Sequence, residues 1–138
     1  MEDFVTYEQA VDLQRFGFDW KCNHYFKWNS LNPTEYIVSH ESAYVNWNHE
    51  NHQDFWLYSA PTLAQAQKWL REIKGVNITI GHVYHRLDTG DKIMYSLHIG
   101  NQSTFKTEFY LNYDSYEEAL TEGIDRALQI LTDKTEKK

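Results

Sequence analysis

The sequence predicts an α+β fold: an antiparallel β-sheet of about five or six strands with three helices on one face. Two observations predict this fold. Three stretches begin with a helix-capping residue and continue with apolar residues at helical spacing. Three others, between the second and third of these helices, alternate between apolar and polar residues. The flanking helices are expected to cover the buried face of the sheet.

Each expected helix starts at a capping box, in which a Ser or Thr hydroxyl accepts a backbone hydrogen bond and a later Gln or Glu returns one. The caps are Thr6 with Gln9, Thr62 with Gln65, and Ser115 with Glu118. The helices are expected over residues 7–16, 63–74 and 116–132. Gly17 and Gly75 can adopt the left-handed conformation that ends a helix. Gly123 lies inside the third helix, where glycine costs about 1 kcal/mol relative to alanine, which predicts close packing against another backbone.

Alternation over residues 76–80, 93–99 and 105–111 predicts a three-stranded meander with one buried and one solvent-facing side. In the last strand, Phe109 and Leu111 belong to the apolar set. Short strands are also expected at residues 36–38, 43–45 and 55–58, as an aromatic-rich extension of the same sheet. Residues 1–132 are therefore expected to form a single α+β domain, followed by a frayed tail at 133–138.

Charge and cysteine content limit the functional classes. The net charge is −7, and residues 1–60 carry −6 of it. Because a phosphate backbone attracts the opposite charge, direct nucleic-acid binding is disfavoured, although an acidic mimic of nucleic acid is an alternative. Cys22 is the only cysteine, which excludes an intrachain disulfide. The chain shows neither a signal peptide nor a membrane-spanning run, so we expect a soluble, cytoplasmic protein without membrane contact.

The helix motifs at residues 6–10, 58–72 and 116–124 support a family resemblance. They resemble motifs in many small uncharacterised proteins of bacteria and bacteriophages. The similarity covers the two ends and the middle of the chain, and consists of caps and apolar stripes. It implies a shared fold and a small accessory protein encoded by a phage or prophage. It carries over no known function and no catalytic residue.

Aromatic residues are unusually frequent, at 16% of the chain. Trp and Tyr dominate the energetics of protein interfaces, although many also fill cores. The interface candidates are Trp20, Trp28, Tyr44, Trp47 and Trp56. Together with the acidic first half and the lack of catalytic motifs, they predict a non-enzymatic protein-interaction module that binds a protein partner or itself. A stack of Trp rings that binds carbohydrate would give the same pattern.

A polar stretch rich in His and acidic residues is the strongest candidate for chemistry. It contains His40, Glu41, His49, Glu50, His52 and Asp54. Imidazole and carboxylate groups are ligands for zinc and similar divalent ions, so the alternative function is a metal-dependent enzyme that uses the His49/His52 loop. The spacing does not match the metalloprotease helix motif, and a solvated polar loop explains the same residues. Cys22, two residues before His24, could be a thiolate nucleophile, but its aromatic neighbours favour a small buried side chain.

Overall fold

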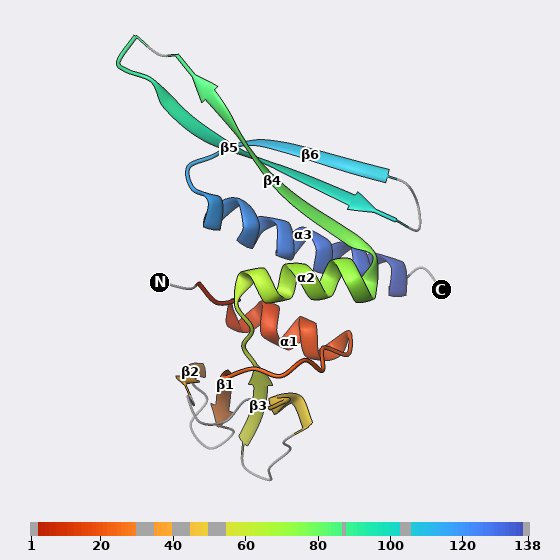
Figure 1. The fold of residues 1–138 in the computed structure, drawn as a ribbon. Helices are drawn as coiled ribbons and strands as arrows, with labels where there is room; N and C mark the ends of the chain where they lie inside the picture. Colours follow the sequence, from red (N-terminus) through yellow and green to blue (C-terminus); the bar gives the residue numbers. More distant parts are fainter. Residues whose placement is uncertain are drawn as a thin grey trace. The chain divides into compact units, whose positions relative to one another are not determined.

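A computed structural model describes residues 3–29, 35–39, 45–49, 55–86, 88–102 and 106–136 of the chain (Figure 1). These residues form three α-helices, six β-strands and one short 3-10 helix, which confirms the predicted α+β class. The helices are α1 (Tyr7–Arg15), α2 (Leu63–Lys74) and α3 (Tyr116–Glu136), and the 3-10 helix η1 is Trp47–His49. The strands are β1 (His24–Asn29), β2 (Glu35–Ser39), β3 (Phe55–Ser59), β4 (Val76–His85), β5 (Lys92–Asn101) and β6 (Lys106–Tyr113).

The single sheet that the sequence predicts is not confirmed. The six strands form two antiparallel sheets of three strands each, in the orders β2-β1-β3 and β4-β5-β6. The chain correspondingly divides into two compact units, residues 1–64 and 65–138. The described strands of each group pair only with one another, and α2 separates β3 from β4 along the chain.

The first unit contains β1, which is the central strand of its sheet and which the sequence pattern did not reveal. Its Cα partners include Ile37 of β2 and Tyr58 of β3, both opposite Phe26. The expected strand at residues 43–45 lies partly outside the described residues. Its last residue, Val45, forms an isolated antiparallel bridge with Cys22.

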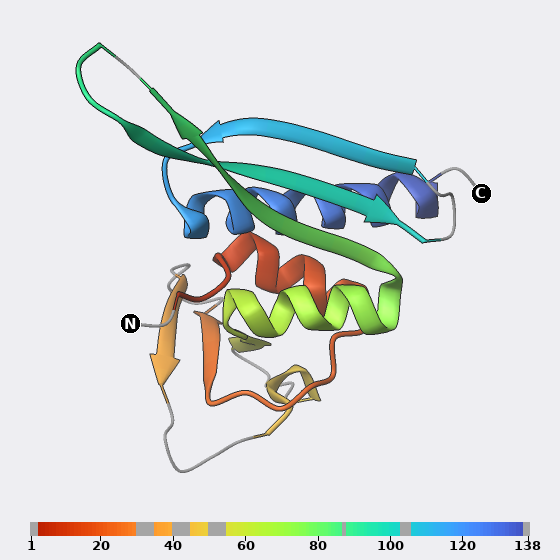
Figure 2. The same cartoon turned by 45° about the horizontal axis from the view of Figure 1, so that its top comes forward.

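The second unit is a meander whose one face is covered by α3 (Figure 2). Ile78, Leu97 and Ile99 are buried on that face, as predicted. Gly123 of α3 lies directly on it: a Cβ added there would be 2.7 Å from Ile78 Cγ2 and 2.8 Å from Leu97 Cδ1. The close packing predicted for Gly123 is therefore present, although the nearest atoms belong to side chains and not to another backbone.

In β6, the third strand of the meander, the side chains that were predicted to face the helix face solvent instead. Phe109 and Leu111 are exposed, whereas Tyr110 points to the α3 side, where the Arg126 guanidinium stacks on its ring at 3.8 Å. Arg126 also donates from Nη1 to the Tyr110 hydroxyl at 3.0 Å, and that hydroxyl donates to Glu108 at 3.1 Å. Partial burial and Glu108 raise the pKa of Tyr110 above its usual range. A β-bulge at Asn112, with φ of 73°, then shifts the register, and the pairing continues with Tyr113 opposite Tyr95.

The first predicted capping box is complete, and the Ser115 hydroxyl caps the third helix as predicted. Gln9 N–H donates to Thr6 Oγ1 at 3.1 Å, and Thr6 N–H donates to Gln9 Oε1 at 2.9 Å, which completes the first capping box. Gly17 and Gly75 both have positive φ, as their roles at helix ends require. The third helix starts on Ser115 and continues to Glu136 instead of ending near residue 132.

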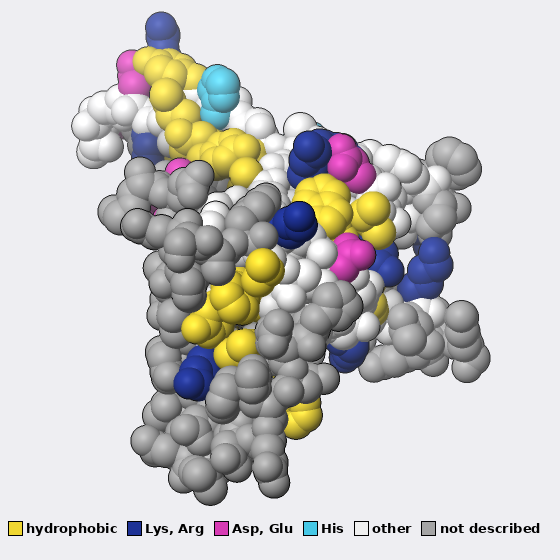
Figure 3. Space-filling model, turned by 60° about the horizontal axis from the view of Figure 1, so that its bottom comes forward, with side chains coloured by type: hydrophobic (Ala, Val, Ile, Leu, Met, Phe, Trp, Pro, Cys, Tyr) yellow, Lys and Arg dark blue, Asp and Glu magenta, His cyan; other side chains and the backbone are white. Residues whose placement is uncertain are grey.

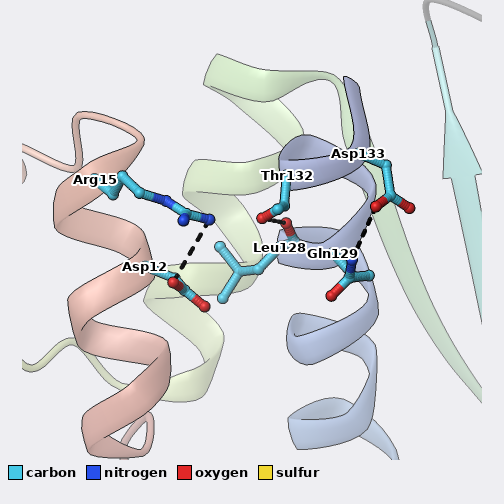
Figure 4. A network of polar contacts seen from close by, with 6 residues as sticks. All are labelled: Asp12, Arg15, Leu128, Gln129, Thr132 and Asp133. Carbon is cyan, nitrogen blue, oxygen red and sulfur yellow. Dashed lines mark hydrogen bonds and ion pairs between the residues drawn. The ribbon is translucent and has the colours of Figure 1, made fainter. Parts of the chain in front are cut away.

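Polar contacts within α1 and within α3 are local (Figure 4). Asp12 pairs with Arg15 at 3.7 Å, Gln129 donates to Asp133 at 2.9 Å, and the Thr132 hydroxyl donates to the carbonyl of Leu128. Side-chain pairs three or four residues apart, such as the first two of these, contribute about 0.3–0.5 kcal/mol each, so they adjust the helices without determining the fold. Among the described helices, none is long and apolar enough to cross a membrane.

Candidate functional site

Trp28 and Trp56 lie directly opposite each other on the neighbouring antiparallel strands β1 and β3. Trp56 is 45% exposed and Trp28 is half-buried. Because side chains two residues apart share a face of a strand, Phe26 and Tyr58 form the next pair on the same face. We call Trp28 and Trp56 the tryptophan pair.

Helix α1 packs against Phe26 and Tyr58, the cross-strand pair next to the tryptophan pair. The ring of Tyr7 meets Phe26 and Tyr58 edge-on, with centroids at 5.8 and 5.7 Å. Such edge-to-face contacts contribute about 0.5–1.5 kcal/mol each beyond the buried area, so they hold this part of the sheet rigid. The tryptophan pair follows two residues away on each strand and ends this row of aromatic side chains. At this end, the large apolar side chain of Trp56 is exposed to solvent.

The opposite face of the same sheet is occupied by a polar network around η1. The indole N–H of Trp47 donates to the Cys22 carbonyl at 2.8 Å, and its ring lies 4.4 Å from that of Tyr25. The Asn48 amide donates to the Phe18 carbonyl at 2.8 Å and accepts from Ser59 N–H at 2.9 Å. These bonds satisfy backbone groups at the sheet edge, so Trp47 has a structural role in addition to its predicted place among the interface residues.

The remaining predicted interface residues have different surroundings. Trp20 is half-buried, with its ring 6.3 Å from that of Phe18. Tyr44 lies outside the described residues. Of the five candidates, the structure therefore brings Trp28 and Trp56 together and leaves Trp56 as the most exposed of the described tryptophans.

The predicted metal ligands cannot be assembled from the described part of the chain. His40, Glu41, Glu50, His52 and Asp54 lie outside it, and His49 is placed by its backbone in η1. Within the described residues, no group of three His, Cys, Asp or Glu side chains could hold a metal ion. The His49/His52 metal site stays a prediction.

Cys22 is buried, as the sequence favoured. Burial raises the pKa of its thiol from 9.0 to about 12, although a hydrogen bond with Ser59 acts in the opposite direction. At neutral pH the side chain is therefore a neutral thiol, which is a poor nucleophile.

We expect iodoacetamide to alkylate Cys22 in the native protein at pH 8 at least 100-fold more slowly than free cysteine. A rise of about three pKa units lowers the thiolate fraction roughly 1,000-fold, and burial also blocks access. Mass spectrometry of timed, quenched samples measures the rate, and the urea-unfolded chain is the control that should react normally. A native rate close to that of free cysteine would contradict this picture.

A pocket of about 320 Å³ lies in the second unit, between the end of α3 and strands β5 and β6. Its apolar base includes Ile99. Its charged lining residues are Lys106, Glu108, Asp133 and Lys134, two of each sign. Such a balanced lining favours neither an anion nor a cation, so the pocket does not identify a ligand class.

The sequence patterns did not reveal one candidate surface, the uncovered face of β4-β5-β6, which carries the exposed Val83, Phe109 and Leu111. Alternation in β6 was the available signal, but alternation alone does not tell which set of side chains faces the helix.

A scan against protein-family models found no match, and searches of curated proteins and of solved structures found no similar chain.

Proposed function

We propose that this chain is a non-enzymatic protein-interaction module that binds a partner protein through the tryptophan pair. The observation that carries the proposal is the exposure of Trp56, opposite Trp28, at the end of an aromatic row that is otherwise packed against Tyr7. An exposed Trp on a rigid strand loses little conformational entropy when a partner covers it, which is why Trp is enriched at the energetic centres of interfaces.

The electrostatic setting supports a protein partner over nucleic acid. Residues 1–60 contain nine acidic and three basic residues, so the part of the chain that bears the tryptophan pair is negative overall. A partner with a basic rim around an apolar pocket would complement it. The resemblance of the helix motifs to small bacterial and phage proteins makes a bacterial lysate the source in which we would search for this partner.

We expect Trp56→Ala to abolish capture of this partner. Loss of a central Trp costs about 2 kcal/mol or more of binding free energy, which is roughly a 30-fold or greater loss of affinity. The measurement is a tagged pull-down from bacterial lysate, followed by mass spectrometry and titration of the identified partner against the purified chain. A partner bound in a fixed ratio by the unmodified chain, and lost with Trp56→Ala, is the expected result.

Tyr116→Ala is the matched control, because Tyr116 is a 43% exposed aromatic residue in α3, in the other unit. It should leave capture unchanged. Equal capture by the Trp56→Ala chain and the unmodified chain would refute the role of the tryptophan pair. Thermal unfolding of both variants checks that each still folds, which we expect since neither side chain belongs to the buried core.

A further inference from the structure

The sheet of the second unit has one face that its own helix does not cover. Tyr116 of α3 packs against Tyr95, and Gly123 packs against Ile78 and Leu97, which fixes the covered face. Alternation from these positions places a different set of side chains on the opposite face. We call this face the open face. Its apolar side chains are Val83, Met94, Phe109 and Leu111, and it also carries Lys92, His98 and the uncharged polar residues Asn77, Thr79, Ser96 and Thr107.

The apolar side chains of the open face are exposed in the folded chain. Phe109 is 53% exposed and Leu111 is 49% exposed, and the His98 ring lies 4.4 Å from that of Phe109. Within residues 65–138, no described element lies over this face (Figure 2). Its apolar side chains come from all three strands, Val83 from β4, Met94 from β5, and Phe109 and Leu111 from β6, and lie among uncharged polar residues.

Acidic residues are absent from the open face, although the chain has 20 of them. The three strands contain one, Glu108, and its hydrogen bond with Tyr110 places it on the α3 side. The single basic side chain of the face, Lys92, is paired with Asp114 at 3.0 Å. At neutral pH the open face thus carries almost no net charge in a protein whose net charge is −7.

We propose that the open face binds the open face of a second copy of this chain, with the two sheets packed face to face. The charge pattern points to this occupant. Two copies of a protein with a charge of −7 repel each other on most surfaces, and a face with almost no net charge is where they can meet without that repulsion. A twofold axis brings the same residues together from both copies, so Phe109 and Leu111 would bury one another.

The size of the face sets the strength of the contact. Three strands spaced about 4.8 Å apart, with about 3.4 Å per residue, give a face of roughly 14 by 30 Å, or about 400 Å² per copy. The total for two copies is below the roughly 1,200 Å² of accessible surface that specific, stable complexes bury. We therefore expect a reversible dimer with a dissociation constant in the micromolar range.

Sedimentation velocity over about 5 to about 300 µM protein tests the proposal directly, because this range should span the monomer–dimer transition. The unmodified chain should shift from monomer to dimer as its concentration rises. Leu111→Glu should remain a monomer throughout, since it places a charge on both sides of the contact. The double variant Phe109→Thr, Leu111→Thr should also remain a monomer. Threonine favours β-strands and adds no charge, so this variant replaces Leu111→Glu if the Glu variant does not fold.

Ile93→Glu is the matched control. Ile93 is also 49% exposed and lies in the same sheet, but on the opposite face, at the projecting end of the β4–β5 hairpin, where Figure 3 shows exposed hydrophobic side chains. This variant should dimerise like the unmodified chain. The proposal is overturned if the unmodified chain stays monomeric at the highest concentration, if it forms species larger than a dimer, or if Ile93→Glu and Leu111→Glu weaken association equally. Because the tryptophan pair lies on other residues, Trp56→Ala should dimerise normally.

Discussion

Replacing Asn48 with alanine is expected to lower the free energy of unfolding by roughly 2–4 kcal/mol. The Asn48 side chain satisfies two backbone groups of the first unit, the carbonyl of Phe18 and the N–H of Ser59. Both residues are buried, so neither group can turn to bulk water when the amide is removed. Each buried polar group left without a partner costs about 1–3 kcal/mol. Urea unfolding followed by Trp fluorescence measures the loss.

Gln129→Ala is the comparison for Asn48→Ala, because it also removes a side-chain amide, but one that bonds to Asp133 on the exposed surface of α3. Its expected cost is below about 0.5 kcal/mol. If the two variants lost similar stability, the η1 network would not be holding the first unit together.

Gly123→Ala is expected to destabilise the protein by about 1–2 kcal/mol, although helix propensity alone predicts a gain of about 1 kcal/mol. The added methyl would lie 2.7 Å from Ile78 Cγ2 and 2.8 Å from Leu97 Cδ1, both in the buried layer under α3. Overpacking of this kind typically costs 1–3 kcal/mol because neither the helix nor the sheet can move freely. The sign of the change in unfolding free energy therefore reports whether α3 packs as closely as the structure indicates.

A double-mutant cycle with Ile78→Ala separates packing from other effects of Gly123→Ala. Removing the Ile78 side chain opens space for the new methyl, so Gly123→Ala should cost less in that background. Equal costs in both backgrounds, or stabilisation by Gly123→Ala alone, would show that the close approach is absent.

The helices could be predicted because their signals are local. Thr6 with Gln9 forms the predicted capping box, and Gly17 and Gly75 take the left-handed conformation at the expected ends. Capping depends on residues within one turn of the helix, so no knowledge of the rest of the fold is needed.

The sheets could be predicted only in part, because strand pairing is non-local. Alternation located β4 and β5 and their buried residues, such as Ile78 and Leu97. It failed for β6, where the stacking of Arg126 on Tyr110 keeps the tyrosine on the helix side and turns Phe109 outward. It also missed β1, in which His24 to Asn29 show no period of two because both faces carry aromatic rings. The division into two sheets leaves no trace in such patterns.

The candidate site could be predicted by residue type but not by arrangement. Composition singled out the tryptophans, yet the pairing of Trp28 with Trp56 follows from the register of β1 and β3. The packing of the Trp47 ring against Tyr25 depends on contacts between segments more than 20 residues apart in sequence. Sequence composition therefore identified a set of large aromatic residues, and the fold separates those that pack inside from those that reach solvent.

One pull-down experiment with three baits tests the central claim most directly: the unmodified chain, Trp56→Ala and Leu111→Glu, each titrated against the partner that the unmodified chain captures. The account predicts that Trp56→Ala lowers the affinity for the partner by a factor of about 30 or more. The Leu111→Glu chain should still bind the partner, although it remains a monomer. Undiminished binding of the partner by folded Trp56→Ala would contradict the proposed function, whatever the outcome for self-association.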